Sequence, residues 1–480
     1  MNYFFRRFFC FLLFCALQLW NSAFSQTYVS GGIYTNTTWS LANSPYFMTG
    51  PVVVFPGKTL TIEPGVEVRV KFNGIPNTGY MHYLEIRGKL QALGTKEQPI
   101  IFHGDTLPEE YSWLGINVRS TQGAQINMDY FELSNSYYGI YADEQGAPEW
   151  NLHHCTFRRN NYAIQPFGPL NFYNCLFEYN GQAIASGWQI NHQIKVKGSA
   201  FLNNFSCNGF QTYLSVDSCI VKKNVNGIWY AQGPVSRTYF ENNTFAIYAF
   251  SGTISDCIFK NNHRGLVEFL GAADNCSFSG NGIAAELASG GSVTGCSFQN
   301  DTVATAYASS LNSSSVLPVF SDNKICGSLR YYVENKSDLS ISLDQNCFCE
   351  TDSALIESKI FDGYDDFTKG LLNYTIYDLN CQDILRQVIK FNPLRISGAA
   401  KEKPFLYPVP AADVIRISIP ESMQNTLLRL ALFDSRGNQI GEERLLRAAA
   451  AEWDLSKVSA GLYSIRIQGE TSAVLRFIKE

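Results

Sequence analysis

The chain has 480 residues and a formal net charge of −5 at pH 7. That length exceeds one small domain, so we expect two or more folded units. A negative net charge means that the chain has no overall excess of basic residues, which argues against nucleic acid as a main partner. Charged residues make up only 16% of the chain, while Gly, Tyr and Phe are plentiful, and this balance favours strands and turns over surface helices.

Residues 1–25 have the pattern of a secretory signal peptide, with cleavage expected before Gln26. Arg6 and Arg7 precede an apolar run from Phe8 to Leu19, and small residues follow it. The run is short for a membrane-spanning helix, and no later segment approaches spanning length. We therefore expect a mature chain without a transmembrane segment.

The signal peptide implies an oxidising compartment, in which the mature chain has an odd number of cysteines. Cys10 and Cys15 lie in the signal segment, which leaves eleven of the thirteen cysteines in the mature chain. At least one of these must be free or must pair with another chain. No CxxC…CxxC zinc spacing occurs, and no cofactor is expected.

A repeat with a period of about 20 residues begins near residue 129. Each copy has a small residue, an apolar residue two positions later, Asn or Asp five positions later, and then Gly or Ala before Ile. The small position holds Asp129, Cys155, Cys175, Ser199, Cys219, Thr238, Cys257, Cys276 and Cys296. The fifth position holds Asn160, Asn180, Asn204, Asn224, Asn243, Asn262, Asn281 and Asp301. Weaker copies continue through Phe320 with Asn323 and through Leu343 with Asn346.

This repeat predicts stacked coils of parallel strands. The alternation of the small residue and Phe places both on one face of a strand, and helical spacing is absent. The leucine frame of leucine-rich repeats is also missing. The Asn residues are expected to adopt left-handed backbone in turns, and to hydrogen-bond the same residue of the next coil as amide ladders do.

These features resemble the right-handed parallel β-helix proteins of the pectin-lyase-like superfamily, over about residues 28–393. The stretches "TLTIEPGVEVRVKF" and "YLEIRGKLQALGTKEQPIIFHG" are similar to the first coils of such secreted bacterial proteins, and "IFDGYDDFTKGLLNYTIYDLNC" to their closing segment. We therefore predict N-terminal coils and a cap at residues 26–128, and β-helix repeats with a closing segment at 129–392. The superfamily includes lyases, hydrolases and non-catalytic binding proteins, so the fold leaves the activity open.

The cysteines of the repeat are interpreted as small buried residues, because Ser199 and Thr238 take the same position. Four further cysteines lie outside that row, and we expect disulfides there that fasten the last coils, with the pairing left open: Cys326, Cys347, Cys349 and Cys381. In an outward row, Glu241 is expected between Lys222 and Lys260, where opposite charges support the stack.

A second row carries aromatic residues after the Gly or Ala and Ile step: Phe167, Trp188, Tyr213, Trp229, Tyr230, Phe250 and Phe269. If they point outward, they form a stripe against which sugar rings can pack. The alternative is that a bend at the strand end turns them inward as an interior stack.

Candidate catalytic and metal-binding groups are few. His153 and His154 should point to opposite sides of a strand, so they should not share one metal ion. Asp362, Asp365 and Asp366 could ligate Ca²⁺, although a capping turn is the preferred interpretation. No pair of outward carboxylates converges as glycoside hydrolysis requires. We therefore favour a non-catalytic protein.

After a linker at residues 393–402, residues 403–480 carry short alternating strands and turns that predict a small β-sandwich. This segment resembles the C-terminal sorting domain of the type IX secretion system, typical of the Bacteroidetes. The matching residues are Tyr407, Pro408, Pro410, Asp434, Gly437, Asp454 and Gly461, and Val409 replaces a usual Asn. The resemblance implies export across both membranes, the secretion machinery as a partner, and a secreted or surface-attached product.

The sequence therefore favours an extracellular β-helix protein that binds polysaccharide or acts in adhesion. Two alternatives stay open: a polysaccharide lyase or glycoside hydrolase, and a purely structural surface spacer.

Overall fold

The structure is a computed structural model that describes residues 27–73, 81–105, 111–142, 149–185, 193–209, 212–343, 345–374, 381, 405–407, 414–418, 427–434, 437–446, 450–469 and 473–479. The chain divides into two compact units, Met1–Ser397 and Gly398–Glu480. The predicted signal peptide and linker lie outside the described residues. No helix among the described residues is long and apolar enough to cross a membrane.

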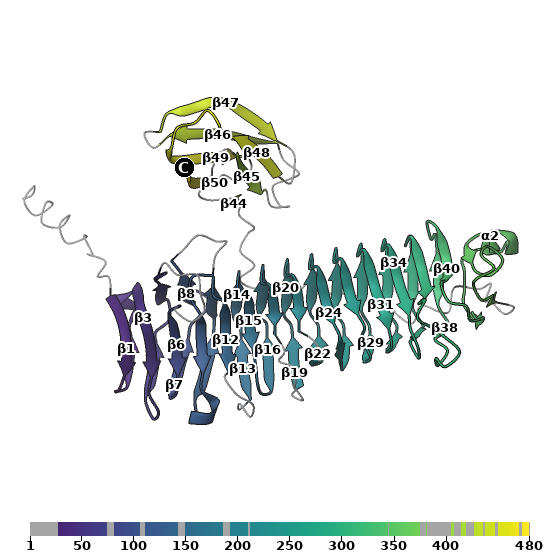
Figure 1. Ribbon diagram of the computed structural model, residues 1–480, viewed down its shortest axis with the longest axis horizontal. Helices are drawn as coiled ribbons and strands as arrows, with labels where there is room; N and C mark the ends of the chain where they lie inside the picture. The colour runs from purple at the N-terminus through teal and green to yellow at the C-terminus, as the bar shows by residue number, and fades with distance from the viewer. Residues whose placement is uncertain are drawn as a thin grey trace, which may run out of the picture. The chain divides into compact units, whose positions relative to one another are not determined.

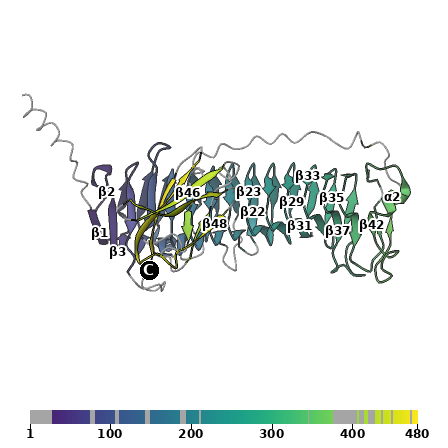
Figure 2. The ribbon, with the colours of Figure 1, turned by 90° about the horizontal axis from the view of Figure 1, so that it is seen from above.

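The first unit is a parallel β-helix in which strands of successive coils pair in three columns (Figure 1). Seen from above, the coils follow one another from β1 (Thr27–Ile33) to β42 (Ile360–Phe361) (Figure 2). β1 pairs with β3 (Tyr46–Val54), which is long enough to pair with strands of both the first and the second column. This arrangement confirms the predicted β-helix.

The first column contains β5 (Glu67–Val70), β8 (Ile100–Gly104), β11 (Phe131–Ser134), β14 (Thr156–Arg158), β17 (Leu176–Glu178), β20 (Ala200–Leu202), β23 (Ile220–Lys222), β27 (Tyr239–Glu241), β30 (Ile258–Lys260), β33 (Ser277–Ser279), β36 (Ser297–Gln299) and β39 (Lys324–Cys326). The second contains β6 (Tyr83–Ile86), β9 (Gly115–Val118), β12 (Tyr138–Ala142), β15 (Tyr162–Gln165), β18 (Gln182–Ile184), β21 (Ser206–Asn208), β24 (Asn226–Trp229), β28 (Phe245–Tyr248), β31 (Arg264–Phe269), β34 (Ile283–Leu287), β37 (Val303–Tyr307), β40 (Tyr331–Asn335) and β42.

The third column contains β2 (Thr37–Trp39), β4 (Thr59–Ile62), β7 (Lys89–Leu93), β10 (Gln125–Asp129), β13 (Trp150–His153), β16 (Leu170–Tyr173), β19 (Gln193–Lys197), β22 (Thr212–Asp217), β26 (Pro234–Ser236), β29 (Thr253–Ser255), β32 (Ala272–Asp274), β35 (Ser292–Thr294) and β38 (Val319–Ser321). β25 (Ala231–Gln232) pairs with β22, and β41 (Ile341–Ser342) with β43 (Leu372–Asn373). The short helices are η1 (Leu41–Asn43), η2 (Ser120–Gln122) and α2 (Ser353–Glu357).

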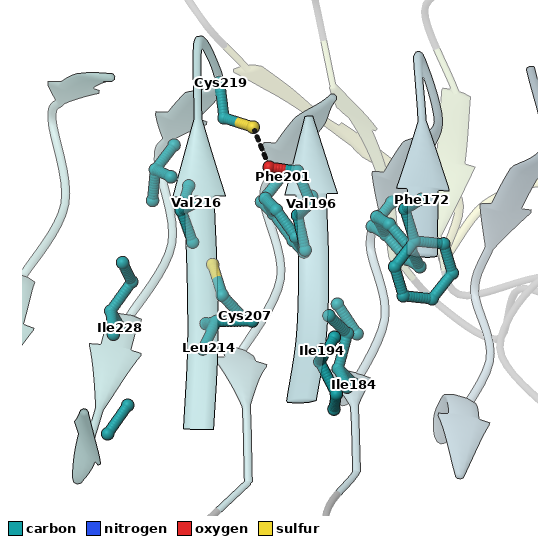
Figure 3. Packing of buried hydrophobic residues seen from close by; sticks show 14 of the residues in the cluster. Phe172, Ile184, Ile194, Val196, Phe201, Cys207, Leu214, Val216, Cys219 and Ile228 are labelled. Carbon is teal, nitrogen blue, oxygen red and sulfur yellow. Dashed lines mark hydrogen bonds between the residues drawn. The ribbon is translucent and has the colours of Figure 1, made fainter. Parts of the chain in front are cut away.

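The Phe positions of the repeat form a buried row in the first column. Residues of this row pair in register from Phe157 to Phe298. The ring centroid of Phe259 lies 4.7 Å from that of Phe240 and 4.7 Å from that of Phe278, which is the spacing of neighbouring strands. Figure 3 shows this interior, where apolar side chains of the three columns pack together.

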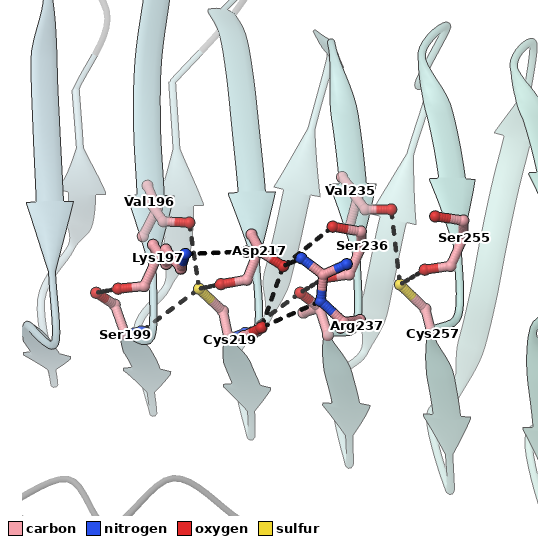
Figure 4. Close-up of polar contacts among 12 residues, drawn as sticks. Val196, Lys197, Ser199, Asp217, Cys219, Val235, Ser236, Arg237, Ser255 and Cys257 are labelled. Atoms are coloured by element: carbon pink, nitrogen blue, oxygen red, sulfur yellow. Dashed lines mark hydrogen bonds and ion pairs between the residues drawn. The ribbon is translucent and has the colours of Figure 1, made fainter. Parts of the chain in front are cut away.

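The row of small residues carries hydrogen bonds as well as fitting a narrow space. Ser199 Oγ donates to the Lys197 carbonyl at 3.1 Å and accepts the Cys175 N–H at 3.0 Å. Cys219 Sγ donates in the same way to the Asp217 carbonyl at 3.3 Å (Figure 4). The hydroxyl or thiol therefore gives a partner to the N–H of the preceding coil, and adds a second hydrogen bond to a carbonyl that already accepts a backbone N–H.

The Asn row forms the predicted amide ladder between the first and second columns. Asn224 Nδ2 donates to Asn243 Oδ1 at 3.1 Å and to the Phe201 carbonyl at 3.0 Å, while its backbone N–H donates to the same Oδ1. The backbone prediction was wrong by one residue. The left-handed residue precedes each ladder position, for example Lys223 with φ of 58°, because the ladder side chain must point inward.

The predicted repeat frame is wrong at both ends. Leu133 pairs with Phe157, so Phe131 and Asp129 lie two residues out of register with the later copies. Asn323 Oδ1 accepts the Cys296 N–H at 3.0 Å, which places Asn323 in the cysteine row and not in the amide ladder. Its side chain, like a thiol, accepts an N–H and donates to a carbonyl, that of Val293.

Two disulfides, Cys326–Cys349 and Cys347–Cys381, confirm the expected disulfides at the last coils. The remaining cysteines of the described residues are free and buried: Cys155, Cys175, Cys207, Cys219, Cys257, Cys276 and Cys296. The predicted charge row is also confirmed, with Lys222 Nζ 2.9 Å from Glu241 Oε2 and Glu241 paired in register with Lys260.

The second unit is the predicted β-sandwich of two antiparallel sheets. One sheet contains β44 (Phe405–Tyr407), β45 (Val414–Ser418) and β48 (Ala450–Asp454). The other contains β47 (Gln439–Leu446), β46 (Leu428–Asp434), β49 (Gly461–Gln468) and β50 (Ala473–Lys479). Its own core includes Ile415, Leu430, Trp453 and Ile465.

Candidate binding face of the β-helix

The predicted aromatic stripe does not form a single exposed row. Phe250 and Phe269 are 0% exposed, and their rings stack inside the coil at 6.4 Å. The residue before each of them, Ala249 or Glu268, has a φ of 47° or 46°. Such left-handed residues reverse the alternation of side chains and turn the two rings inward. The prediction that they could be an exposed stripe is wrong, and the inward alternative holds for them.

The other stripe residues lie apart from one another. Trp188 lies outside the described residues. Phe167 packs against the core between β15 and β16, and Tyr213 lies on β22 in the third column. Among the described members of the stripe, Trp229 and Tyr230 alone come together on the outer side of the second column.

Trp229 and Tyr230 belong to a partly exposed cluster that we call the aromatic patch, formed with Phe245 and Tyr248. Trp229 and Tyr248 stack at 4.8 Å on neighbouring coils, and Tyr230 lies tilted 5.2 Å from Tyr248. Phe245 lies 6.0 Å from Tyr248. Sequence reasoning missed Phe245 and Tyr248, although Tyr248 follows Ile247 as Trp229 follows Ile228.

The hydroxyl group of Tyr248 stays protonated at neutral pH. Burial raises the pKa of Tyr248, and its hydrogen bonds with Tyr230 and Glu268 raise it further. Trp229 and Tyr248 cover one ring face of each other. The patch therefore offers partly exposed aromatic surface for contact with a ligand.

A second cluster of partly exposed tyrosines lies nearer the N-terminus on the same column. Tyr138 stacks with Tyr162 at 5.5 Å, and Tyr137 and Tyr141 contact Tyr138 at 4.8 Å and 5.0 Å. Burial raises the pKa values of Tyr138 and Tyr141. The second column therefore carries aromatic hydroxyl groups at two places along its outer side.

The buried carboxylates on this column are held by cations. Glu85 pairs with Arg87 and with Arg119, whose Nε lies 3.0 Å from Glu85 Oε2. Glu286 pairs with Arg264 and with Lys336 Nζ at 3.1 Å. The two glutamates lie on β6 and β34, many coils apart, so they cannot act together on one glycosidic bond.

The histidine pair differs from its prediction. His154 has a φ of 49°, so both His153 and His154 are partly exposed instead of facing opposite sides. His154 Nδ1 lies 2.9 Å from Asp129 Oδ1, and the His154 ring stacks on Tyr130 at 4.3 Å. The two imidazole centroids are 6.4 Å apart and each ring has its own neighbours, which indicates structural roles.

The acidic segment at the closing end forms a capping turn. Asp362 accepts the N–H groups of Tyr364 and Leu372 at 2.9 Å and 2.7 Å. Asp366 accepts the Thr368 N–H at 3.0 Å. These carboxylates satisfy backbone donors of the turn, as the preferred interpretation of the sequence expects.

The sorting motif residues organise turns of the sandwich. Asp434 Oδ1 accepts the Asn438 N–H at 2.8 Å. Gly437 has a φ of 84°, a left-handed backbone conformation that glycine adopts without steric cost. Asp454 accepts the Ser456 N–H at 2.8 Å, and these hydrogen bonds with Ser456 lower its pKa. Gly461 begins β49 and Tyr407 ends β44, whereas Pro408 and Pro410 lie outside the described residues.

Comparisons with known proteins agree with this architecture. Residues 31–145 match the family described as pectate-lyase like beta helix domain. Residues 405–480 match the family described as secretion system C-terminal sorting domain. A stretch of 74 residues is 34% identical to Protein bark beetle of Drosophila melanogaster, covering 15% of this chain and 2% of that protein. The chain thus combines a pectate-lyase-like β-helix domain with a type IX sorting domain, which directs its export to the cell surface or the extracellular space.

Proposed function

We propose that this exported β-helix protein binds an extracellular polysaccharide, and so acts in adhesion, through the aromatic patch. The observation that carries the proposal is the partly exposed cluster of Trp229, Tyr230, Phe245 and Tyr248 on one outer column. Exposed aromatic groups on a rigid scaffold usually mark a binding surface, and the tyrosine hydroxyls suit a partner rich in hydroxyl groups.

A structural surface spacer is the second candidate. It is supported by the complete burial of Phe250 and Phe269, which removes two of the aromatic residues that a long binding stripe would need. The amide ladder and the two runs of stacked Phe rings would suit a stiff rod in either case.

The test compares retention on a panel of acidic and neutral polysaccharides by affinity electrophoresis. The double variant Trp229→Ala with Tyr248→Ala should bind about tenfold more weakly or worse, a change of about 1.4 kcal/mol. Tyr364→Ala is the matched control, because Tyr364 is 80% exposed at the closing end and away from the patch. Phe250 is unsuitable for this test, because its removal would damage the core.

Three results would contradict the proposal. Unchanged retention of the double variant on every polysaccharide that the wild type binds would exclude the patch. No retention of the wild type would favour the spacer. Formation of new reducing ends or unsaturated products, measured with and without Ca²⁺, would instead identify a lyase or hydrolase.

A further inference from the structure

The first coil of the β-helix begins with a strand that is paired on one side. β1 pairs with β3, and among the described residues no strand pairs with its other edge (Figure 1). A free strand edge presents backbone N–H and C=O groups that can pair with a further strand. Removal of the signal segment before Gln26, which the sequence leads us to expect, would leave one residue ahead of Thr27, too few to cover this edge.

This edge lacks the features by which proteins normally protect free strands. Charged side chains and proline are the usual protection against pairing with another chain. Residues 27–57 contain no Asp, Glu, Lys, Arg or His, and β1 contains no proline. The sequence of the first coil therefore leaves the edge open to a further strand.

The hydrophobic core also ends at β1 without a cover. Val29 and Ile33 pack against the core but stay partly exposed. The β3 residues in register with them, Met48 and Val54, are 0% exposed. One further strand over β1 would bury Val29 and Ile33 in the way that β1 buries the side chains of β3.

We propose that the partner of this edge is β1 of a second copy, so that two β-helices join at their N-terminal ends. A two-fold axis that passes by Ser30 would relate the copies, and two strands related in this way pair antiparallel. The proposal rests on β1 and not on the proposed polysaccharide binding.

The residue pattern of β1 is complementary to itself about Ser30. The strand turns a corner of the coil here, where its register with β3 shifts between Val29 and Gly31. An axis at the corner lays the first arm of one strand along the second arm of the other. The resulting pairs are Thr27 with Ile33, Tyr28 with Gly32, and Val29 with Gly31.

These pairs place side chains of the same face together. Thr27, Val29, Gly31 and Ile33 are in register with buried residues of β3, so their pairs extend the core. Tyr28 is 61% exposed on the outer face, and glycine opposite it leaves room for its ring. A shift of the axis by half a residue would pair core positions with outer positions, so Ser30 is the position that fits.

Sedimentation velocity of the chain from Gln26 onward measures the association. The mass should rise from monomer to dimer as the concentration increases from about 1 to about 100 µM. A wild type that stays monomeric throughout, or that forms assemblies larger than a dimer, would overturn the proposal.

A charge swap at the axis tests the arrangement itself. Ser30 is exposed and would face Ser30 of the other copy. Ser30→Lys and Ser30→Glu should each raise the dissociation constant about tenfold or more, because like charges would lie directly opposite each other. An equimolar mixture of the two variants should recover the dimer. Ser309→Lys, at an exposed residue of the closing end, is the matched control and should associate as the wild type does.

Undiminished association of both single variants, or a mixture that stays monomeric, would contradict pairing at Ser30. Thermal unfolding of each variant at low concentration should match that of the wild-type monomer, so that lost association cannot be assigned to misfolding.

Cross-linking provides a readout that does not depend on repulsion. Directly opposed residues of antiparallel strands have Cα atoms about 4.5–5.5 Å apart, within reach of a disulfide. Ser30→Cys should therefore form a covalent dimer with oxidised glutathione, which takes up two electrons and two protons and becomes two glutathione thiols. The free cysteines of the described residues are buried, and Ser309→Cys should stay monomeric. Equal yields of covalent dimer from both variants, or none from Ser30→Cys, would overturn the proposal.

Discussion

Ser199 illustrates how one buried residue satisfies two backbone groups. Its hydroxyl accepts the Cys175 N–H and donates to the Lys197 carbonyl. Ser199→Ala should lower the free energy of unfolding by about 1–3 kcal/mol, because it leaves the buried Cys175 N–H without a partner, whereas the Lys197 carbonyl keeps the Asn174 N–H. Ser199→Cys should change it by much less, since cysteine makes the same contacts elsewhere in the row. Urea unfolding of the three proteins measures the difference, and equal losses in both variants would exclude this role of the hydroxyl.

Asp301 ends the amide ladder with a carboxyl group in place of an amide. Its Oδ1 accepts two hydrogen bonds from Asn281, while its Oδ2 is buried and has no hydrogen-bond partner among the described residues. Burial raises the pKa of Asp301 to about 7. The folded protein therefore holds a proton that the unfolded chain releases above about pH 4.

The raised pKa sets the sign of a pH-dependent prediction. Below about pH 4, Asp301 is protonated in both states and its burial carries no titration cost. From there to about pH 7, unfolding becomes more favourable by about 1.4 kcal/mol per pH unit. Asp301→Asn should therefore stabilise the protein by a few kcal/mol at pH 8 and much less at pH 4. Urea unfolding at both pH values checks this, and an equal gain at both would exclude protonation as the cause.

Within the amide ladder, the Asn side chain makes the hydrogen bonds between coils, whereas the residue before it provides the left-handed backbone of the turn. Asn224→Ala should lower the free energy of unfolding by about 3 kcal/mol or more, because the Asn204 and Phe201 groups that it pairs with stay buried. Lys223→Asn is the matched control. Lys223 is the left-handed residue of this turn, and Asn tolerates that backbone better than Lys, so the variant should be neutral or slightly more stable.

Guanidinium unfolding monitored by far-UV circular dichroism compares the two ladder variants. A loss for Lys223→Asn as large as that for Asn224→Ala would contradict the separation of tasks. It would show that the turn is sensitive to any substitution, whatever hydrogen bonds the side chain makes.

The elements that the sequence predicts well are those with a constant period. From Phe157 to Phe298 every coil repeats the same positions, so one alignment gives the register of the whole row. The prediction fails between Cys296 and Asn323, where the coil is longer and another residue type takes over the same hydrogen bonds. Sequence spacing alone does not show which of two polar positions an Asn fills.

The outer face is harder to predict because it depends on single backbone conformations. Ala249 and Glu268 adopt left-handed backbone, which Gly or Asn would have indicated but these residue types do not. Each reverses the alternation and sends the next Phe into the core. The pairing of the four cysteines in disulfides could not be predicted from the sequence either, because it depends on which coil ends meet in space.

At the scale of the whole molecule, each of the two units has its own hydrophobic core. The sandwich carries the sorting motifs, and its hairpin depends on Asp434 and Gly437 within residues 405–480. Because the sorting domain directs export, a chain that ends at Ala400 should fold its β-helix and fail to cross the outer membrane.

Immunoblotting of cell, surface and medium fractions from a host with a type IX secretion system tests this prediction. The full chain should reach the surface or medium, whereas the shortened chain should be at least tenfold depleted there. Thermal unfolding of the purified shortened chain should keep the β-helix transition, so that lost export cannot be assigned to misfolding. Tyr364→Ala in the full chain should be exported normally. Export of the shortened chain at the wild-type level would mean that the β-helix carries its own signal for crossing the outer membrane.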